Sequence, residues 1–391
     1  MKNECIDKSN LEDIIIKYIN EKDKYDDEPF YIVDLEKVQE QYAKWINYLP
    51  DIQPYFAVKS NPDNKIINLL AKLGCNFDCA SKNELINALS IVNNPDRIIF
   101  ANPCKISSHL IYAHENNINK MTFDCVEELE KIHNLYPNAK LILRICVDDT
   151  NSKCKFNSKF GCPLCNIPII FDKIKSLQMN LSGISFHVGS GCSDAKSFYN
   201  AIKDCHYTYK ISQEYGFNIN VIDIGGGFPG VDKNIMFADI CKNINNAVDD
   251  FFSYEKNNNI IKFIAEPGRY FTEATHTLII NVIAKKKEND VIKYYLNDGI
   301  YGSFNCINYD HQTPVLIPLF KKDNIIKYNT TFFGPTCDSM DCIYKDIQYQ
   351  ELNVGDWLYI DNFGSYTTAP SSSFNGFSVT NKKYIHTTLT I

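Results

Sequence analysis

Short apolar runs recur along the first two-thirds of the chain. They are rich in Ile, Val and Phe and end in polar residues or glycine, which is typical of buried parallel strands. Eight follow one another, at Gln53–Val58, Cys75–Cys79, Arg97–Ala101, Lys120–Asp124, Lys140–Cys146, Gly183–Val188, Asn220–Ile224 and Lys262–Ala265.

Helical patterns lie between these runs. Asn64–Leu73 and Lys82–Val92 have apolar residues at helical spacing, and Val126–Leu135 carries three glutamates near its start, where the helix dipole favours negative charge. Eight strands alternating with helices over about 215 residues predict an α/β fold with a closed (β/α)8 barrel of the TIM type. An open doubly wound sheet is the alternative, but eight consecutive βα units favour closure.

The pattern changes after Arg269. His276–Ala284 and Val291–Asn297 are apolar runs on either side of a charged stretch, which predicts a hairpin, and Asn353–Asp361 is another strand signal. Few helical windows follow, and Phe30–Val33 reads as an early strand that joins this part. We therefore expect a barrel over residues 35–269 and a mostly β domain built from residues 1–34 and 270–391.

Composition narrows the class of protein. The chain has 391 residues, 45% of them hydrophobic, and a formal net charge of −7. No apolar run reaches the ~20 residues needed to span a bilayer, and Met1–Glu28 lacks the apolar stretch of a signal peptide. An acidic chain without a long basic cluster argues against nucleic acid as a partner. We expect no membrane and no nucleic-acid partner, and a small-molecule substrate.

The cysteines point to a compartment. Fifteen are scattered along a chain without an export signal, which is typical of reduced thiols in the cytoplasm. Cys162 and Cys165 have a spacing found in metal sites, but no second pair or histidine pair stands at a matching distance. We interpret them as two thiols in a loop and expect no metal.

Residues at the C-terminal ends of barrel strands are the first candidates for chemistry. Lys59 follows the apolar run Tyr55–Val58, where a lysine could merely extend to solvent or act as a nucleophile toward a carbonyl. The seventh strand ends in Asp223 and a triple glycine, Gly225–Gly227, whose backbone N–H groups could bind a phosphate near Arg269.

Together these groups suggest pyridoxal phosphate. Lys59 would bind the cofactor covalently, and the carboxylate of Glu266 would keep the pyridine nitrogen protonated, which makes the ring an electron sink. His187 could stack on the ring. Each has a simpler reading, since Glu266 could pair with Arg269 and His187 could be a hydrogen-bonded core histidine. The convergence of five strand ends on one cofactor favours the functional reading.

The motifs resemble those of a known family, the pyridoxal-phosphate-dependent decarboxylases with an alanine-racemase-like barrel, most closely the eukaryotic-type ornithine decarboxylases. The matches run in family order from about residue 30 to the C-terminus. They are Tyr55-Phe-Ala-Val-Lys-Ser-Asn61, Phe77-Asp-Cys-Ala-Ser-Lys-Asn-Glu84, Ser185-Phe-His-Val-Gly-Ser-Gly-Cys192, Asp223-Ile-Gly-Gly-Gly-Phe228, Ala265-Glu-Pro-Gly-Arg-Tyr270, Asn297–Cys306, Gly334-Pro-Thr-Cys-Asp338 and Phe374-Asn-Gly-Phe377.

The resemblance implies decarboxylation of L-ornithine to putrescine and CO2, the first step of polyamine biosynthesis, in a homodimer with shared active sites. Cys337, from the second subunit, would return a proton to Cα, and Asp338 beside it would bind the substrate's distal ammonium with Tyr309 and Asp310. Cofactor contacts would come from Lys59, Asp78, Glu84, Arg144, His187, Ser190, Gly225, Gly226, Gly227, Glu266, Pro267, Gly268, Arg269 and Tyr366. Lys59, His187, Glu266 and Cys337 would be the catalytic residues.

Other members of the fold fit less well. An amino-acid racemase usually has arginine at the pyridine nitrogen, where this chain has Glu266, and lacks Cys337. A diaminopimelate decarboxylase needs a cation for a distal carboxylate, which Asp310 and Asp338 would repel. Lysine or arginine decarboxylation stays open, although Asp rather than Glu at position 310 favours ornithine. An inactive regulatory homologue is the remaining alternative. Ser60 and Ser339 depart from the residues usual in the family.

Overall fold

The computed structural model describes residues 11–320 and 326–385. The parts of the expected β-rich domain that fall on residues 1–10, 321–325 and 386–391 lie outside this description. By internal contacts the chain divides into two compact units, one made of residues 39–271 and the other of residues 1–38 and 272–391. The domain limits drawn from the sequence, 35–269 and the flanking segments, remain a prediction.

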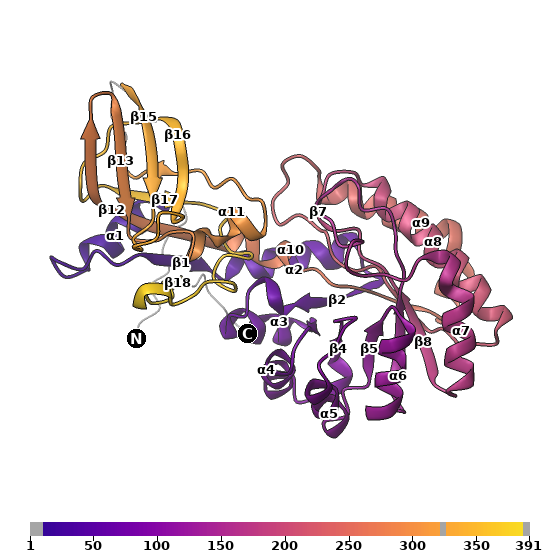
Figure 1. Cartoon of the computed structure of the whole chain (residues 1–391). Helices are drawn as coiled ribbons and strands as arrows, with labels where there is room; N and C mark the ends of the chain where they lie inside the picture. The colour runs from indigo at the N-terminus through magenta and orange to yellow at the C-terminus, as the bar shows by residue number, and fades with distance from the viewer. Residues whose placement is uncertain (1–10, 321–325, 386–391) are drawn as a thin grey trace. The chain divides into compact units, whose positions relative to one another are not determined.

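The unit of residues 39–271 contains a closed eight-stranded barrel in which every neighbouring pair of strands is parallel. The predicted TIM-type barrel is confirmed. Figure 1 shows helices α4, α5 and α6 on the outer side of strands β4 and β5. The barrel strands are β2 (Ile52–Ala57), β3 (Asn76–Cys79), β4 (Ile98–Phe100), β5 (Lys120–Phe123), β6 (Lys140–Arg144), β8 (Asn180–Ser185), β10 (Val221–Asp223) and β11 (Lys262–Ala265).

Helices connect consecutive barrel strands, as the alternating pattern predicts. They are α3 (Asn64–Leu73), α4 (Lys82–Val92), α5 (Ser107–Glu115), α6 (Val126–Leu135), α7 (Ile167–Ser176), α8 (Lys196–Glu214) and α9 (Phe237–Asn257), while α2 (Glu36–Tyr48) precedes the first barrel strand and α10 (Arg269–Thr272) follows the last. Short 3-10 turns add η1 (Val58–Ser60), η2 (Pro95–Arg97) and η3 (Leu164–Asn166). A two-stranded ribbon, β7 (Ser152–Cys154) with β9 (Ser190–Cys192), was not expected from the sequence.

Helix α3 illustrates how local sequence sets these limits. Asp63 caps its first turn by accepting hydrogen bonds from the backbone N–H groups of Lys65 and Ile66. Gly74 ends the helix in the left-handed conformation, with φ of 97°, which glycine adopts without a steric penalty. Between the caps, Ile66, Ile67, Leu69 and Leu70 are buried. The predicted limits of α3, α4 and α6 therefore coincide with the observed ones.

The other unit is mostly β. Its largest sheet runs β14-β17-β12-β13-β15-β16, and β1 joins it through β12 and also pairs with β18. The early strand at Phe30 thus pairs where the sequence predicted. The hairpin of β12 and β13 is present, but Lys285–Glu288 belong to strand β12 and only two residues form the turn. The strands are β1 (Phe30–Asp34), β12 (His276–Glu288), β13 (Val291–Leu296), β14 (Ile317–Pro318), β15 (Lys327–Phe333), β16 (Cys342–Gln350), β17 (Trp357–Ile360) and β18 (Asn381–Ile385).

Short helical segments complete this unit. They are α1 (Leu11–Asn20), η4 (Glu273–Thr275), η5 (Ser303–Asn305), α11 (Cys306–Tyr309) and η6 (Phe374–Gly376). Within the ranges that the structure describes, no helix combines the length and apolar character needed to cross a bilayer.

Candidate cofactor and substrate site

The candidate site of the barrel starts at Lys59, which lies on η1 directly after strand β2. Its Nζ is 3.5 Å from Oδ2 of Asp78 on the neighbouring strand β3. The Lys59 side chain is 43% exposed, while that of Asp78 is 1% exposed. The amine is therefore accessible to a small molecule, and a buried carboxylate holds it in place.

Three carboxyl groups near this amine interact electrostatically with one another. They are Asp78, Asp223 at the end of β10, and Glu266 directly after β11. Burial raises the pKa of all three above the usual carboxyl range, and Arg144 at the end of β6 opposes the rise for Asp78 and Asp223. A buried cluster with perturbed pKa values at a barrel mouth marks a functional site.

His187 follows strand β8 and carries no positive charge at neutral pH. Burial, and then the charges of Arg144 and Lys59, hold its pKa well below the usual value. Its Nδ1 accepts a hydrogen bond from the backbone N–H of Gly189 at 2.9 Å, so the ring proton is on Nε2. The ring is thus neutral and fixed in one orientation, as a stacking partner requires.

The triple glycine packs tightly against the ends of neighbouring strands. A Cβ on Gly225, whose φ is 64°, would lie 2.1 Å from the carbonyl oxygen of Phe186. A Cβ on Gly226 would lie 2.8 Å from the Glu266 carbonyl oxygen and 2.9 Å from Nε2 of His187. Only glycine fits at both positions, so the backbone here comes close to whatever His187 and Glu266 hold.

A phosphate position is suggested beside these glycines. Nη2 of Arg269, the first residue of α10, donates a hydrogen bond to Oγ of Ser190 on β9 at 3.2 Å. A Cβ on Gly227 would lie 2.7 Å from the carbonyl oxygen of Gly189, so Gly227 packs against the residue preceding Ser190. A guanidinium, a hydroxyl and glycine N–H groups gathered at one place suit a phosphate.

Pro267 and Gly268 support Lys59 rather than adding a charged contact. The Pro267 carbonyl accepts a hydrogen bond from the backbone N–H of Ala57 at 3.2 Å. A Cβ on Gly268 would lie 2.9 Å from Cβ of Ser60. The turn that carries Lys59 is therefore packed directly on the segment after β11.

Glu84 has a structural contact that the sequence did not predict. Its Oε2 accepts a hydrogen bond from the Ala80 backbone N–H at 2.6 Å, and Ser81 caps helix α4 by accepting from the Glu84 N–H. This is a variant of the capping box. Burial also raises the pKa of Glu84. The charge of Asp78 adds to this rise and the charge of Lys59 opposes it, both to a smaller extent. Glu84 thus anchors the segment after Asp78.

The remaining predicted residues belong to the β-rich unit, which is described by itself. Cys337 is exposed, and its backbone N–H donates to Oδ1 of Asn375 at 2.9 Å. Asp338 accepts hydrogen bonds from the Tyr301 hydroxyl at 2.5 Å and from the Met340 N–H at 3.0 Å. The loop thus presents a thiol and an oriented carboxylate at its surface.

Asp341 fixes the base of that loop. It is 1% exposed, and Oδ1 accepts a hydrogen bond from the Ile300 N–H at 2.8 Å. Oδ2 accepts from both the N–H and the hydroxyl of Thr336, at 3.0 and 2.7 Å. The Gly334 N–H also donates to the Asp341 carbonyl at 2.8 Å. Both ends of the segment from Gly334 to Asp341 are tied together.

Asp310 and Tyr309 differ in exposure. Asp310 is 7% exposed and accepts a hydrogen bond from Nε2 of Gln312 at 2.5 Å, while Tyr309 is 71% exposed.

Tyr366 has a positive φ of 56°, and its neighbour Ser365 is hydrogen-bonded to Thr272 through the two hydroxyls. These contacts fix the backbone around the residues that the resemblance assigns to substrate and phosphate.

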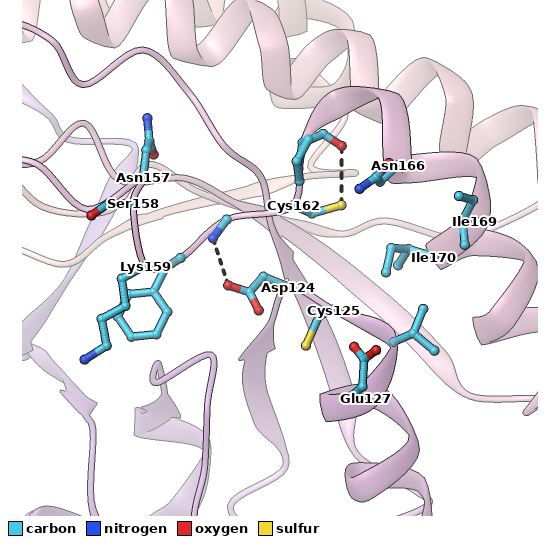
Figure 2. A pocket seen from close by; sticks show the side chains of 14 residues that line it. Asp124, Cys125, Glu127, Asn157, Ser158, Lys159, Cys162, Asn166, Ile169 and Ile170 are labelled. Atoms are coloured by element: carbon cyan, nitrogen blue, oxygen red, sulfur yellow. Dashed lines mark hydrogen bonds between the residues drawn. The ribbon is translucent and has the colours of Figure 1, made fainter.

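A separate pocket of about 480 Å³ lies between the start of α6 and the loop that precedes α7 (Figure 2). Asp124, Cys125, Lys159 and Cys162 contribute to its wall, and none of the predicted site residues does. Oδ2 of Asp124 accepts a hydrogen bond from the Gly161 N–H at 2.8 Å. Neither Cys162 nor Cys165 forms a disulfide, and no cluster of metal-binding side chains occurs among the described residues.

The unsatisfied hydrogen-bonding groups of the barrel site show that its residues fit pyridoxal phosphate. Among the described residues, neither oxygen of Asp78 and only one oxygen of Asp223 accepts a hydrogen bond of good geometry. Buried carboxyl oxygens without donors suit a cationic ring. Lys59 supplies the amine, His187 a flat neutral ring, and Ser190 with Arg269 the phosphate contacts. Asp223 also belongs to this site. The sequence motifs assigned it no role, although it stands two residues before the triple glycine that is expected to bind the phosphate.

Comparisons with known proteins show the family to which the chain belongs. A family model described as the pyridoxal binding domain of pyridoxal-dependent decarboxylases matches residues 35–273. Ornithine decarboxylase of Schizosaccharomyces pombe is 43% identical, over 93% of this chain and 84% of its own length. Antizyme inhibitor 2 of Xenopus laevis is 42% identical, over 93% and 83%. The crystal structure of the arginine decarboxylase of Paramecium bursaria Chlorella virus has a TM-score of 0.90 at 32% identity, over 96% of this chain and 100% of its own. The chain belongs to the pyridoxal-dependent decarboxylase family.

Proposed function

We propose that this protein decarboxylates L-ornithine to putrescine and CO2, and so starts polyamine biosynthesis. The observation that carries the proposal is the pair of carboxylates Asp310 and Asp338 in the β-rich unit, each held by a neutral hydrogen-bond donor, Gln312 and Tyr301. Hydrogen bonds from the Met340 N–H and the Tyr301 hydroxyl lower the pKa of Asp338, and two acidic side chains suit a cationic substrate tail. The ornithine decarboxylase relative at 43% identity supports the same substrate.

The cofactor is pyridoxal 5′-phosphate, which when bound supplies an electron sink for the electrons left at Cα after CO2 departs. Lys59 would hold it covalently, and Asp78 would orient the Lys59 side chain before that bond forms. The Glu266 carboxylate would bind the ring nitrogen, and the neutral His187 would cover one ring face without adding charge. Ser190, Gly227, Arg269 and Tyr366 would bind the phosphate.

Cys337 would return the proton to Cα, and Asp338 would bind the distal ammonium with Asp310. We propose that both residues act in the site of a second subunit of a homodimer. The surroundings of Cys337 support an interface, since Met340 is 75% exposed and Phe374 is 42% exposed although both are apolar. We also propose a cytoplasmic location, in keeping with the many thiols.

Two other functions have specific support. Arginine or lysine as the substrate is supported by the arginine decarboxylase neighbour, whose TM-score is 0.90. A regulatory role without catalysis is supported by the antizyme inhibitor 2 relative. Against the second stands the presence of Lys59, Glu266, His187 and Cys337 together, which a chain without catalysis would not need.

The test measures CO2 release with added pyridoxal phosphate from ornithine, lysine, arginine and diaminopimelate in parallel. We expect release from ornithine by a wide margin. Release mainly from another substrate would overturn the assignment of ornithine. Folded protein that releases no CO2 from any of the four would favour the regulatory role.

A further inference from the structure

Asp223 is a buried carboxyl group at the centre of the barrel site to which the proposed mechanism gives no task. Its exposure is 0%, and it lies at the C-terminal end of β10, in the register between β8 and β11. Oδ1 accepts a hydrogen bond from the Gly225 N–H at 2.9 Å. Its other oxygen, Oδ2, accepts none from a donor in the described residues. A buried carboxyl oxygen in this state needs a proton or a ligand.

Glu266 is the group that meets Asp223. The Glu266 backbone N–H donates to the Gly225 carbonyl at 2.7 Å, which ties the segment after β11 to the segment after β10. The two side chains interact directly, and each acts on the pKa of the other. Two ionised carboxylates have no donor between them, so a hydrogen bond within the pair requires one shared proton.

The charge balance of the surroundings agrees with one proton. Among the charges that act directly on the pair, Lys59 and Arg144 face Asp78, and with Asp223 and Glu266 themselves the sum is +2 − 3 = −1 when all are ionised; Asp124 near Arg144 and Glu84 near Lys59 make the wider surroundings more negative still. One proton on the Asp223–Glu266 pair brings the sum to zero, which a buried site favours. Three charged groups act on the pair, namely Asp78 on β3, Lys59 on η1 and Arg144 on β6. Tyr55 on β2 and Cys205 on α8 interact with Asp223, and the neutral His187 lies near Glu266.

We propose that Asp223 is a positioning residue for Glu266, and that the two carboxyl groups share one proton until Glu266 exchanges this hydrogen bond for one from the protonated nitrogen of the cofactor ring. In that exchange the O–H bond of the pair breaks, its proton leaves to solvent, and both carboxylates remain ionised beside the ring N–H and Arg144. Asp223 would thereby keep Glu266 turned toward the ring and reserve its place for a cationic ring. The inference rests on the cofactor site and not on the identity of the substrate.

The proposal predicts that the number of protons released on cofactor binding depends on Asp223. Asp223→Asn keeps an oxygen for the Gly225 N–H and offers an N–H to Glu266, so Glu266 is ionised without a shared proton. The cofactor-free variant then holds one proton fewer than the natural protein, while the loaded forms hold the same number. By linkage, the ratio of the two affinities changes by up to tenfold per pH unit below the pKa of the pair.

The probe is pyridoxine 5′-phosphate, which has the ring and phosphate but no aldehyde, so Lys59 does not react with it. Calorimetry on the full chain freed of cofactor, in buffers of different ionisation enthalpy, counts the protons exchanged on binding. We expect the natural protein to release about one proton more per site than Asp223→Asn. Asp149→Asn is the matched control, because Asp149 is 6% exposed but accepts hydrogen bonds from the Phe156 and Asn157 N–H groups. It should give the natural proton count.

An equal proton count for the natural protein and Asp223→Asn would overturn the proposal. A natural protein that binds no pyridoxine 5′-phosphate would overturn the cofactor site and the proposal with it, whereas failure to act on ornithine would leave both standing. If Asp223→Asn does not fold, difference infrared spectroscopy on the natural protein replaces it. The C=O band of a protonated carboxyl should disappear on binding of the probe, and an unchanged band would refute the shared proton.

Discussion

Replacing Asp78 by asparagine should stabilise the cofactor-free protein while weakening its hold on the cofactor. The Asp78 side chain is 1% exposed and meets Lys59 Nζ only at 3.5 Å, and neither oxygen accepts a hydrogen bond of good geometry among the described residues. Burial raises the pKa of this carboxyl in spite of the opposing charges of Lys59 and Arg144. The cost of desolvating the carboxylate therefore exceeds what the two cations return.

The magnitude follows from these contacts. A buried acceptor without a donor costs about 1–3 kcal/mol, and more when charged. The lost ion pair with Lys59 subtracts up to about 1 kcal/mol, because the Lys59 side chain is 43% exposed and solvent screens it. The net gain is about 1–2 kcal/mol, or a rise in melting temperature of about 1–3 °C for a chain of 391 residues.

The effect should depend on pH with a definite sign. Because the folded-state pKa of Asp78 is raised, the natural protein loses stability as the pH rises from the unfolded-state value, about 3.9, through the folded-state value. Asp78→Asn lacks this loss. The gap between the two melting temperatures should therefore be smallest near pH 4 and widen as the pH rises toward 7.

The assay is thermal unfolding of the full chain, without and with pyridoxal phosphate, between pH 4 and 7. Asp149→Asn is the opposite control, since it keeps an oxygen for the Phe156 and Asn157 N–H groups but loses the charge that strengthens these bonds, at 2.6 and 2.9 Å, and should be destabilised by about 1–2 kcal/mol. Added cofactor should stabilise the natural protein more than Asp78→Asn. A cofactor-free Asp78→Asn that melts below the natural protein at pH 7 would refute the reasoning.

Three further predictions concern the reaction. Cys337→Ala should keep the cofactor, since this side chain is exposed in the β-rich unit, but should lose clean putrescine formation; a normal product and rate would contradict its role. Asp310→Glu should shift preference among ornithine, lysine and arginine, because the longer side chain reduces the depth left for the tail, and an unchanged profile would count against Asp310. Mixing inactive Lys59→Ala and Cys337→Ala chains should restore about a quarter of natural activity, since half of the dimers would be mixed and each would hold one intact site; no recovery despite subunit exchange would argue against shared sites.

The sequence predicted the barrel well because its signals are local. Lys262–Ala265 is a strand at the predicted limits, and α3, α4 and α6 begin and end where their apolar spacing indicates. The segment Lys285–Glu288 was read as a hairpin tip because it is charged, but strand β12 continues through it with exposed side chains. Composition alone does not separate an exposed strand edge from a turn.

Two features of the barrel escaped because they depend on tertiary contacts. Glu128 was read as a charge favourable to the start of α6, yet it is 4% exposed and pairs with Lys105, whose side chain is wholly buried. Asp223 looked like the last residue of a strand, and only the meeting of β10 with the segment after β11 brings it to Glu266. No spacing in the sequence joins residues that are 43 positions apart.

The tied segment from Gly334 to Asp341 affects how the proposed dimer would behave. Asp341 already holds Thr336 and Ile300, and Asn375 holds the Cys337 backbone, so this loop is ordered before any second chain arrives. Ordering a side chain on association costs about 0.5–1.5 kcal/mol of free energy. Because this loop is already ordered, association of the two chains involves little of that cost. A loosely associated dimer could then have fully formed active sites, and activity per chain would fall on dilution while the fold of each chain stayed intact.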